Sequence, residues 1–388
     1  MLFPPGMLVV ALLLPSALGP DWPHQQADPA RRGGEGPLPD HPTLLWKFKA
    51  AGDLLVPPAV ASGRVVVLDA DGKVTSLSLS DGKTLWNRRF TGAFWAAPAI
   101  SGGRIFAAIS RRETRYETTR GGLFSPGSAV AVTDEKGEAL CLDLERGQTL
   151  WSRSFSRPIP GGPAVEGERL VLGSTDYKVH CLSTRDGAEL WSYKTSGEVV
   201  ASPAIVEGRV LAPSRDRRLY CLDLESGQEI WAFKGSGEFI SPCACVGGRV
   251  FAAANDGNVF CMSLSDGKAI WRFSASEGVV ASPVVSDRRV YVASGPVLHC
   301  LSGGDGEEAW SVRSPRNFFF SPAVSGERLV ISSRAGHLLA LDSRTGEELW
   351  KYPLVRDAPA RLALAPGRVL AATAGRCLYC LGEGDENR

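Results

Sequence analysis

The sequence predicts an all-β fold, a single eight-bladed β-propeller of four-stranded antiparallel blades, from three observations. Eight of the ten tryptophans recur about every 40 residues, with one interval longer by about 25 residues. Glycine lies four residues before seven of them, and proline usually lies twelve residues after them. Each repeat holds four short strand-like runs, and none has helical periodicity. The eight tryptophans are Trp46, Trp86, Trp151, Trp191, Trp231, Trp271, Trp310 and Trp350.

The first segment of the chain is predicted to be a leader sequence for export. Residues 1–19 are predicted to be a signal peptide, because Met7–Leu18 is an apolar run too short to span a bilayer and small residues follow it. An exported chain, periplasmic or extracellular, is therefore expected. No basic residue precedes the apolar run and Pro20 follows the expected cut, so a cytoplasmic chain is the alternative. Residues 20–42 are rich in proline, glycine and charge and are predicted to be a flexible linker.

One repeat, residues 201–237, shows how each blade is built. Its four strand-like runs are SPAIV, GRVLAPS, RRLYCLDL and QEIWAFK, separated by turn residues. Gly227 is expected in the tight turn between the third and fourth strands, where a positive φ costs glycine little. Trp231 is expected to bury its large apolar surface at the seam between adjacent blades.

The two ends of the repeat array complement each other. The array opens with a lone outer strand, Leu44–Ala50, and closes with three strands over about Ala358–Leu381. We therefore expect seven complete blades and an eighth in which the N-terminal outer strand joins the last three C-terminal strands. This closure removes the exposed sheet edges of an open array. The propeller is predicted over residues 43–382, with a polar tail at 383–388.

Six of the nine cysteines share one repeat position, ten residues before the tryptophan. Serine or alanine occupies it in two other blades, so the position favours a small, packed side chain. Equivalent positions in neighbouring blades should lie too far apart for a disulfide. His180 and His299 directly precede two of these cysteines and are expected to pack between blades. The six are Cys141, Cys181, Cys221, Cys261, Cys300 and Cys380.

Composition excludes several functional classes. Lys and Arg total 43 and Asp and Glu total 42, so the chain lacks the strong positive charge of a nucleic-acid binder. No apolar run reaches 18 residues, so no transmembrane helix is expected. No nucleophile–base pair, phosphate-binding loop or metal-ligand spacing appears. We therefore expect no catalytic residue, metal or cofactor, and a chain that is monomeric by itself.

The loops that enter the inner strands share one face with the turns between second and third strands, and this top face is the predicted partner-binding surface. Charged residues of the entering loops would surround the mouth of the central channel: Asp53, Glu198, Glu238 and Arg356. Aromatic residues such as Trp95 and Phe319 begin inner strands, and alternation should send some toward the channel and others into the blades. Ordinary solvated loops and core packing are the alternatives.

An insertion of about residues 110–134 separates the second and third strands of the second blade. We expect it to project on the top face and to contact a partner, since so long a departure from a regular array favours function. Its arginines could bind an acidic partner, although two glutamates dilute the charge. Its candidate contact residues are Arg111, Arg112, Arg115, Tyr116, Arg120 and Phe124.

The turn-and-tryptophan element resembles the docking motif of pyrroloquinoline quinone (PQQ)-type propellers. The segments LDLESGQEIW (Leu222–Trp231) and LDSRTGEELW (Leu341–Trp350) show it best, and the resemblance covers about residues 44–381. That family contains quinoprotein dehydrogenases and also non-enzymatic members, among them the propeller lipoprotein of the outer-membrane β-barrel assembly machine. The enzymes are longer and carry adjacent cysteines and Ca²⁺ ligands, and this chain has no Cys-Cys pair.

The resemblance therefore implies a non-catalytic scaffold that binds an unidentified protein or peptide partner on its top face, with a role in cell-envelope protein assembly. A PQQ- or metal-dependent oxidoreductase and a carbohydrate-binding propeller are the alternatives.

Overall fold

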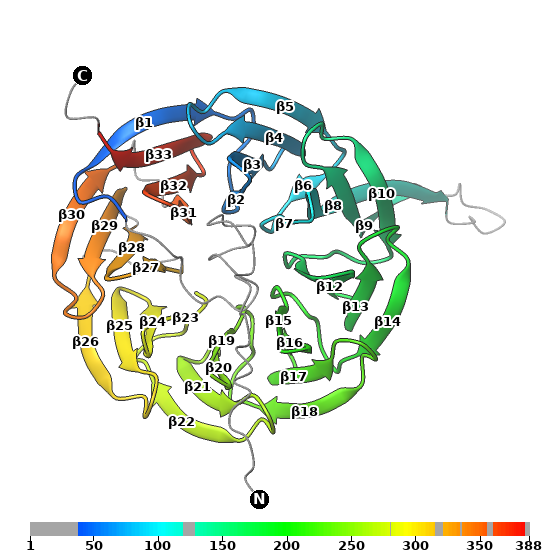
Figure 1. The fold of residues 1–388 in the computed structure, drawn as a ribbon. Coiled ribbons are helices and arrows are strands. Elements are labelled where there is room, and N and C mark those ends of the chain that lie inside the picture. The colour runs from blue at the N-terminus through cyan, green and yellow to red at the C-terminus, as the bar shows by residue number, and fades with distance from the viewer. Residues whose placement is uncertain are drawn as a thin grey trace, which may run out of the picture.

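The repeats fold into eight antiparallel sheets around one axis, as the sequence predicts (Figure 1). The computed structural model describes residues 38–118, 129–279, 281–314, 321–333, 336–354 and 360–384. Within these ranges, no helix has the length and apolar content needed to cross a membrane.

The blades follow one another along the chain, with these strand bounds. The first blade holds β2 (Ala59–Ala61), β3 (Arg64–Leu68), β4 (Lys73–Ser78) and β5 (Thr84–Arg89). The second holds β6 (Ala93–Phe94), β7 (Ala99–Ser101), β8 (Arg104–Thr118), β9 (Ala129–Asp143) and β10 (Thr149–Phe155). The third holds β11 (Ala164–Glu166), β12 (Arg169–Ser174), β13 (Lys178–Ser183) and β14 (Glu189–Lys194). The fourth holds β15 (Ala204–Val206), β16 (Arg209–Pro213), β17 (Arg218–Asp223) and β18 (Glu229–Lys234).

The remaining blades complete the ring. The fifth holds β19 (Ala244–Val246), β20 (Arg249–Ala253), β21 (Asn258–Ser263) and β22 (Ala269–Ser274). The sixth holds β23 (Val284–Ser286), β24 (Arg289–Ser294), β25 (Val297–Ser302) and β26 (Glu308–Arg313). The seventh holds β27 (Ala323–Ser325), β28 (Arg328–Ser333), β29 (His337–Asp342) and β30 (Glu348–Pro353). The eighth holds β31 (Ala360–Ala365), β32 (Arg368–Thr373), β33 (Cys377–Glu383) and β1 (Pro42–Lys49).

The seams between blades are built from the repeated tryptophan and glycine. The indole N–H of Trp191 donates to the carbonyl of Leu224 in the next blade at 2.9 Å. A Cβ added to Gly227 would lie only 2.5 Å from Cδ2 of Trp191, and the φ of Gly227 is +72°. Glycine is therefore favoured at this position for two reasons: the left-handed turn that the sequence predicts, and the close approach of an indole ring, which leaves no room for a Cβ.

The outer strand of each blade contains a β-bulge at the residue before the tryptophan. In the fourth blade Cys221 pairs with Trp231 but Leu222 pairs with Glu229, so Ile230 is the extra residue. Ile230 is 42% exposed, whereas Trp231 is buried. The bulge thus turns an apolar side chain outward on the rim of the ring while the tryptophan faces the seam.

The ring closes as predicted, by the two ends of the chain. β1 pairs antiparallel with β33, from Pro42 opposite Glu383 to Lys49 opposite Cys377. Residues 38–41, at the end of the predicted linker, also contact the ring: the carbonyl of Pro39 accepts a hydrogen bond from the indole of Trp350 at 3.0 Å.

The shared cysteine position lies in the core, which confirms its packing role. All six of these cysteines are fully buried. Burial raises the pKa of Cys141 and of Cys221 to about 12, so that these thiols stay protonated and behave as small apolar groups. His180 also packs between blades, because its ring meets the ring of Phe155 from the preceding blade edge-on at 5.0 Å.

Candidate functional site

The loops entering the inner strands are joined by hydrogen bonds to the turns between second and third strands. Together they form the face that was predicted as the top face, which we call the loop face from here on. The backbone N–H of Arg215 donates to the carbonyl of Glu198, and that of Asn255 donates to the carbonyl of Glu238, both at 2.9 Å. The same contact joins Ala70 to Asp53 at 2.9 Å. These bonds hold the loop face on the rigid blades.

The predicted charged residues of this face are engaged by neighbouring loops. A carboxylate oxygen of Glu198 lies 2.8 Å from the guanidinium of Arg215. Asp53 pairs with Arg376 at 3.2 Å, a contact that joins the first and last blades. Each ion pair therefore connects two loops of this face. Because the side chains are partly exposed, solvent weakens the attraction between the two charges of each pair.

Two further charged residues were predicted on this face. The side-chain oxygen of Asn255 accepts a hydrogen bond from the backbone N–H of Glu238 at 2.9 Å. Arg356 lies outside the described residues. A partner-binding role for the four charged residues stays a prediction.

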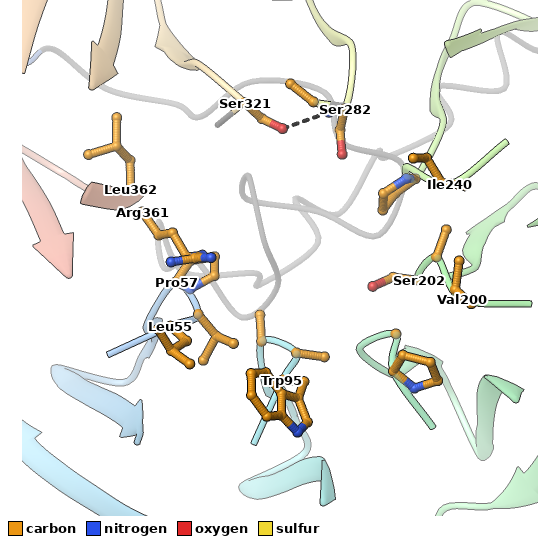
Figure 2. Close-up of a pocket in the computed structure, with 18 residues that line it drawn as sticks. Leu55, Pro57, Trp95, Val200, Ser202, Ile240, Ser282, Ser321, Arg361 and Leu362 are labelled. Atoms are coloured by element: carbon orange, nitrogen blue, oxygen red, sulfur yellow. Dashed lines mark hydrogen bonds between the residues drawn. The ribbon is translucent and has the colours of Figure 1, made fainter. Parts of the chain in front are cut away.

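The aromatic residues at the starts of inner strands divide between channel and core, as alternation predicts. Trp95 lines the central channel and is 56% exposed, and Figure 2 shows its ring at the channel wall. Phe94 and Phe239 are fully buried inside the blades. Phe319 lies outside the described residues. Trp95 is thus a large apolar side chain that a ligand in the channel could contact.

The insertion of the second blade is an extension of two strands. β8 and β9 pair from Arg104 opposite Asp143 to Thr118 opposite Ala129. β6 pairs with β8 at Ser110, and β10 pairs with β9 only from Gly137 onward. The outer parts of β8 and β9, which we call the arm (residues 111–118 and 129–136), therefore pair only with each other within the described residues. In Figure 1 the arm reaches beyond the rim of the ring.

The predicted contact residues of the insertion are distributed along this arm. Arg111, at its base, forms an ion pair with Glu138 of β9. Arg112, Arg115 and Tyr116 lie on β8. Arg120 and Phe124 fall outside the described residues.

The residues that directly precede or begin the inner strands form a ring around the central channel, which we call the neck. The neck surrounds a cavity of about 290 Å³ that all eight blades line. Seven of its residues occupy the same repeat position, eleven residues after the tryptophan: Pro57, Ala97, Ser202, Pro242, Ser282, Ser321 and Arg361. In the third blade the adjacent Gly161 lines the cavity, and a Cβ there would lie 2.7 Å from the backbone of Ala201. The neck is therefore closely packed and mostly uncharged.

Arg361 differs from every other lining residue of the neck in being charged. Burial lowers the pKa of its guanidinium to about 10, which still leaves it protonated at neutral pH. Arg361 was not among the residues predicted for a binding site. The signal was available, because this repeat position holds a small residue in the other seven blades and a long cationic one only here.

Two serine hydroxyls of the neck form a repeated contact between blades. The backbone N–H of Gly162 donates to Oγ of Ser202 at 2.8 Å. The backbone N–H of Ser282 donates to Oγ of Ser321, also at 2.8 Å (Figure 2). Across the described ranges, no group of three or more His, Cys, Asp or Glu side chains is arranged to hold a metal ion. The arrangement supports binding through shape and apolar contact.

Comparison with known proteins identifies relatives of the chain. A family model described as outer membrane protein assembly factor BamB matches residues 39–123, 135–242 and 215–381. The BamB of Nitrosomonas eutropha is 31% identical over 116 residues, which are 29% of this chain and 23% of that protein. The matches to three such curated relatives span from 23% to 47% of their lengths.

Solved structures share the fold. BamB from Moraxella catarrhalis superimposes with a TM-score of 0.71 at 16% identity, covering 88% of this chain and all of that one. The quinohemoprotein alcohol dehydrogenase of Comamonas testosteroni superimposes with a TM-score of 0.74 at 12% identity, covering 95% of this chain and 81% of that one. At these identities the likeness extends to the fold alone.

Proposed function

Because the chain belongs to the family of the outer membrane protein assembly factor BamB, we propose that it is a non-catalytic scaffold that binds a protein or peptide partner during outer-membrane protein assembly. The observation that carries this proposal is the family match, which extends over nearly the whole propeller. The proposal includes export to the cell envelope, in agreement with the signal peptide expected at residues 1–19.

The loop face and the arm are the surfaces that we propose for the partner. The loop face is held by backbone hydrogen bonds to the rigid blades, so it loses little conformational entropy on binding. The arm reaches beyond the ring and has two strands whose outer edges pair with no other described strand. Such edges can accept an extended partner strand through backbone hydrogen bonds.

A co-purification experiment tests the docking role. The tagged chain is expressed in its own host and recovered from envelope extract beside a variant in which residues 112–135 are replaced by Asn-Gly. This change keeps the pair of Arg111 and Lys136 and closes it with a favoured two-residue turn. We expect the intact chain to recover components of outer-membrane protein assembly and the arm-shortened variant to lose most of them.

Two results would count against the proposal. If the intact chain recovers no outer-membrane assembly component, the scaffold role in this process is wrong. If the arm-shortened variant recovers the same components in the same amounts, the arm is not the docking site. A matched control replaces Ser226 and Arg344, on turns between third and fourth strands, by alanine and should leave recovery unchanged.

A quinone-dependent oxidoreductase is the second candidate, and the fold shared with the alcohol dehydrogenase favours it. Calorimetric titration of the purified chain with PQQ in the presence of Ca²⁺ separates the two. The scaffold proposal predicts no tight stoichiometric binding and no dye reduction with alcohols. Binding in a 1:1 ratio with turnover would overturn it.

A further inference from the structure

The outer strands of the ring differ in charge from blade to blade. β1, β5 and β10 follow one another along the rim, in the eighth, first and second blades (Figure 1). These three strands hold five basic residues and no acidic residue, whereas the other five outer strands together hold five basic and four acidic residues. All but the last of the five are exposed. We call them the basic rim: Lys47, Lys49, Arg88, Arg89 and Arg153.

Two repeat positions account for much of this difference. The position two residues before the tryptophan is glutamate in the third, fourth, sixth and seventh blades, but leucine or threonine in the three blades of the basic rim. The position two residues after the tryptophan is aromatic or valine in six blades, where the side chain packs partly buried against a core cluster. In the first and second blades it is Arg88 and Arg153. Two departures from the repeat thus concentrate positive charge in neighbouring blades.

The contacts of the basic rim leave most of its charge in place. The guanidinium of Arg88 donates to a backbone carbonyl of the second blade at 3.0 Å. The ammonium of Lys47 lies 4.8 Å from the centroid of the Tyr379 ring. A carbonyl and an aromatic ring hold a cation without neutralising it. Arg153 lies 3.4 Å from the carboxylate of Glu189 in the third blade, so its charge is offset in part.

Acidic residues in the adjoining turns are paired with other basic residues. Asp81, in the turn before β5, lies 2.9 Å from the ammonium of Lys83. Glu145, in the turn before β10, forms an ion pair with Arg64. These carboxylates therefore balance charges of the turns rather than those of the basic rim.

We propose that the basic rim binds an extended, acidic segment of a partner protein. Carboxylates suit this surface, because a guanidinium binds a planar carboxylate through two parallel hydrogen bonds. The bulge residues Leu45, Leu85 and Leu150 are 38%, 47% and 47% exposed on the same three strands. They offer apolar contacts between the charges, so the segment that fits best combines acidic residues with some apolar ones.

The shape of the ring favours a polypeptide over a membrane surface. Eight blades around one axis lie about 45° apart, so β1 and β10 face directions about 90° apart. A flat membrane cannot contact both strands at once, whereas an extended chain can follow the curve. Each of the three strands is also the last in its sheet among the described strands, so its outer edge offers backbone hydrogen bonds to such a chain. This surface uses neither the loop face nor the arm, so the proposal stands independently of the assembly role.

Fluorescence anisotropy with paired peptides tests the basic rim. The probe is a rhodamine-labelled peptide of about 20 residues, roughly 66 Å long when extended, that repeats Glu-Gly-Leu-Ser. Its neutral counterpart has glutamine in place of glutamate. With the full chain at about 50 mM salt, we expect the acidic peptide to bind with a Kd of about 100 µM or tighter and the neutral one at least about tenfold more weakly. Raising the salt to about 300 mM should weaken binding of the acidic peptide.

Two variants that lose equal charge show whether the position of the charge matters. The first carries Lys47→Gln, Lys49→Gln, Arg88→Gln and Arg89→Gln. The control removes four exposed cations from other outer strands and carries Lys194→Gln, Lys234→Gln, Arg313→Gln and Lys351→Gln. We expect the first to bind the acidic peptide at least about tenfold more weakly, because four contacts are lost together, and the control to bind as the wild type does. A smaller variant, Lys49→Gln with Arg89→Gln, keeps the contacts of Arg88 and Lys47 and should weaken binding about threefold.

Three results with the peptides would overturn the proposal: equal binding of the acidic and neutral peptides, equal effects of the two charge-matched variants, or no binding of either peptide. Phosphatidylglycerol vesicles supply the remaining comparison. If the full chain binds these vesicles but not the acidic peptide, the basic rim contacts a membrane and the proposal is wrong.

Discussion

Gly227 shows, at the scale of single residues, why the repeat tolerates little variation at the seams. Its φ of +72° disfavours any side chain, and the indole of Trp191 leaves no room for one. The sequence pattern predicts the first reason, because glycine precedes the tryptophan in a turn. The second was not predictable from one repeat, since the ring comes from the preceding blade.

A pair of glycine substitutions separates these two reasons. Gly227→Ala should lower the free energy of unfolding by about 3 kcal/mol, because a left-handed backbone and a clash with Trp191 add together. Gly208→Ala, at a φ of +70° with open space around it, should cost only about 1 kcal/mol. Urea unfolding of both variants measures the difference. Equal losses would show that the seam contact contributes nothing.

His180 is a buried polar residue whose position was predicted from the sequence but whose hydrogen-bond partners were not. Packing between blades was predicted, but its carboxylate partners were not. One ring nitrogen lies 3.0 Å from Asp176 and the other lies 3.1 Å from Glu189. Burial opposes the ionisation of Asp176, yet the hydrogen bond and charge of His180 prevail and lower the pKa of Asp176 below its ordinary 3.8.

This lowered pKa predicts a pH-dependent contribution to stability. A carboxylate whose pKa is lower in the folded state stabilises the fold above its unfolded pKa, and this stabilisation is lost as the pH falls through the folded pKa. Asp176→Asn should therefore be less stable than the wild type at pH 6, and the gap should narrow below about pH 4. Thermal melts from pH 7 to pH 3 measure it. A gap that stays constant over this range would refute the linkage.

At the scale of elements, the outer strands differ from simple alternation. The sequence pattern predicts a strand from QEIWAFK, but Ile230 and Trp231 are adjacent apolar residues that cannot share a face in a regular strand. The β-bulge resolves this by making Ile230 the extra residue, 42% exposed. Adjacent apolar residues could have indicated a bulge, although the identity of the exposed residue depends on the pairing register.

The arm is the element whose length was predicted and whose structure was not. The insertion appears in the sequence as a longer interval between tryptophans, rich in arginine and glycine. The structure continues β8 and β9 into it, because segments such as Ala129–Val132 alternate β-branched and small residues.

Shortening the arm should leave the ring intact. The outer parts of β8 and β9 pair only with each other among the described strands, so replacing residues 112–135 by Asn-Gly removes no pairing to the other strands of the blade. We expect the melting temperature to change by no more than about 2 °C, which corresponds to roughly 1 kcal/mol or a little more in a chain of this size. Differential scanning calorimetry measures this. A large fall would mean that the arm stabilises the propeller.

At the scale of the whole molecule, the closure of the ring is the feature most directly predicted from sequence. The N-terminal end of the array has an outer strand without a blade, and the C-terminal end has a blade that lacks its outer strand. The unpaired backbone groups of both are hydrogen-bonded only if the two pair with each other. The pairing of β1 with β33 confirms it. The charged neck was not predicted, because a single position is noticed only when the eight repeats are aligned and compared residue by residue.

Removing the closing strand should destabilise the propeller. A chain that begins at Ala51 lacks β1, which exposes the edge of β33 and leaves the seam of Trp46 unfilled. We expect it to aggregate or to melt at least about 10 °C below a chain that begins at Leu38. Melting temperature and size-exclusion profile report the effect. Equal melting of the two chains would contradict closure by the N-terminal strand.

We propose that this propeller is a binding scaffold whose partner docks on the loop face. Site-specific photo-crosslinking in the native host tests it most directly, with the crosslinking residue placed at Trp95 or Glu238 on the loop face, or at Ser226 or Arg344 on the opposite face. Mass spectrometry identifies what each position captures. We predict outer-membrane assembly proteins at the loop-face positions alone. Capture of the same proteins only from the opposite face, or of none from either face, would contradict the claim.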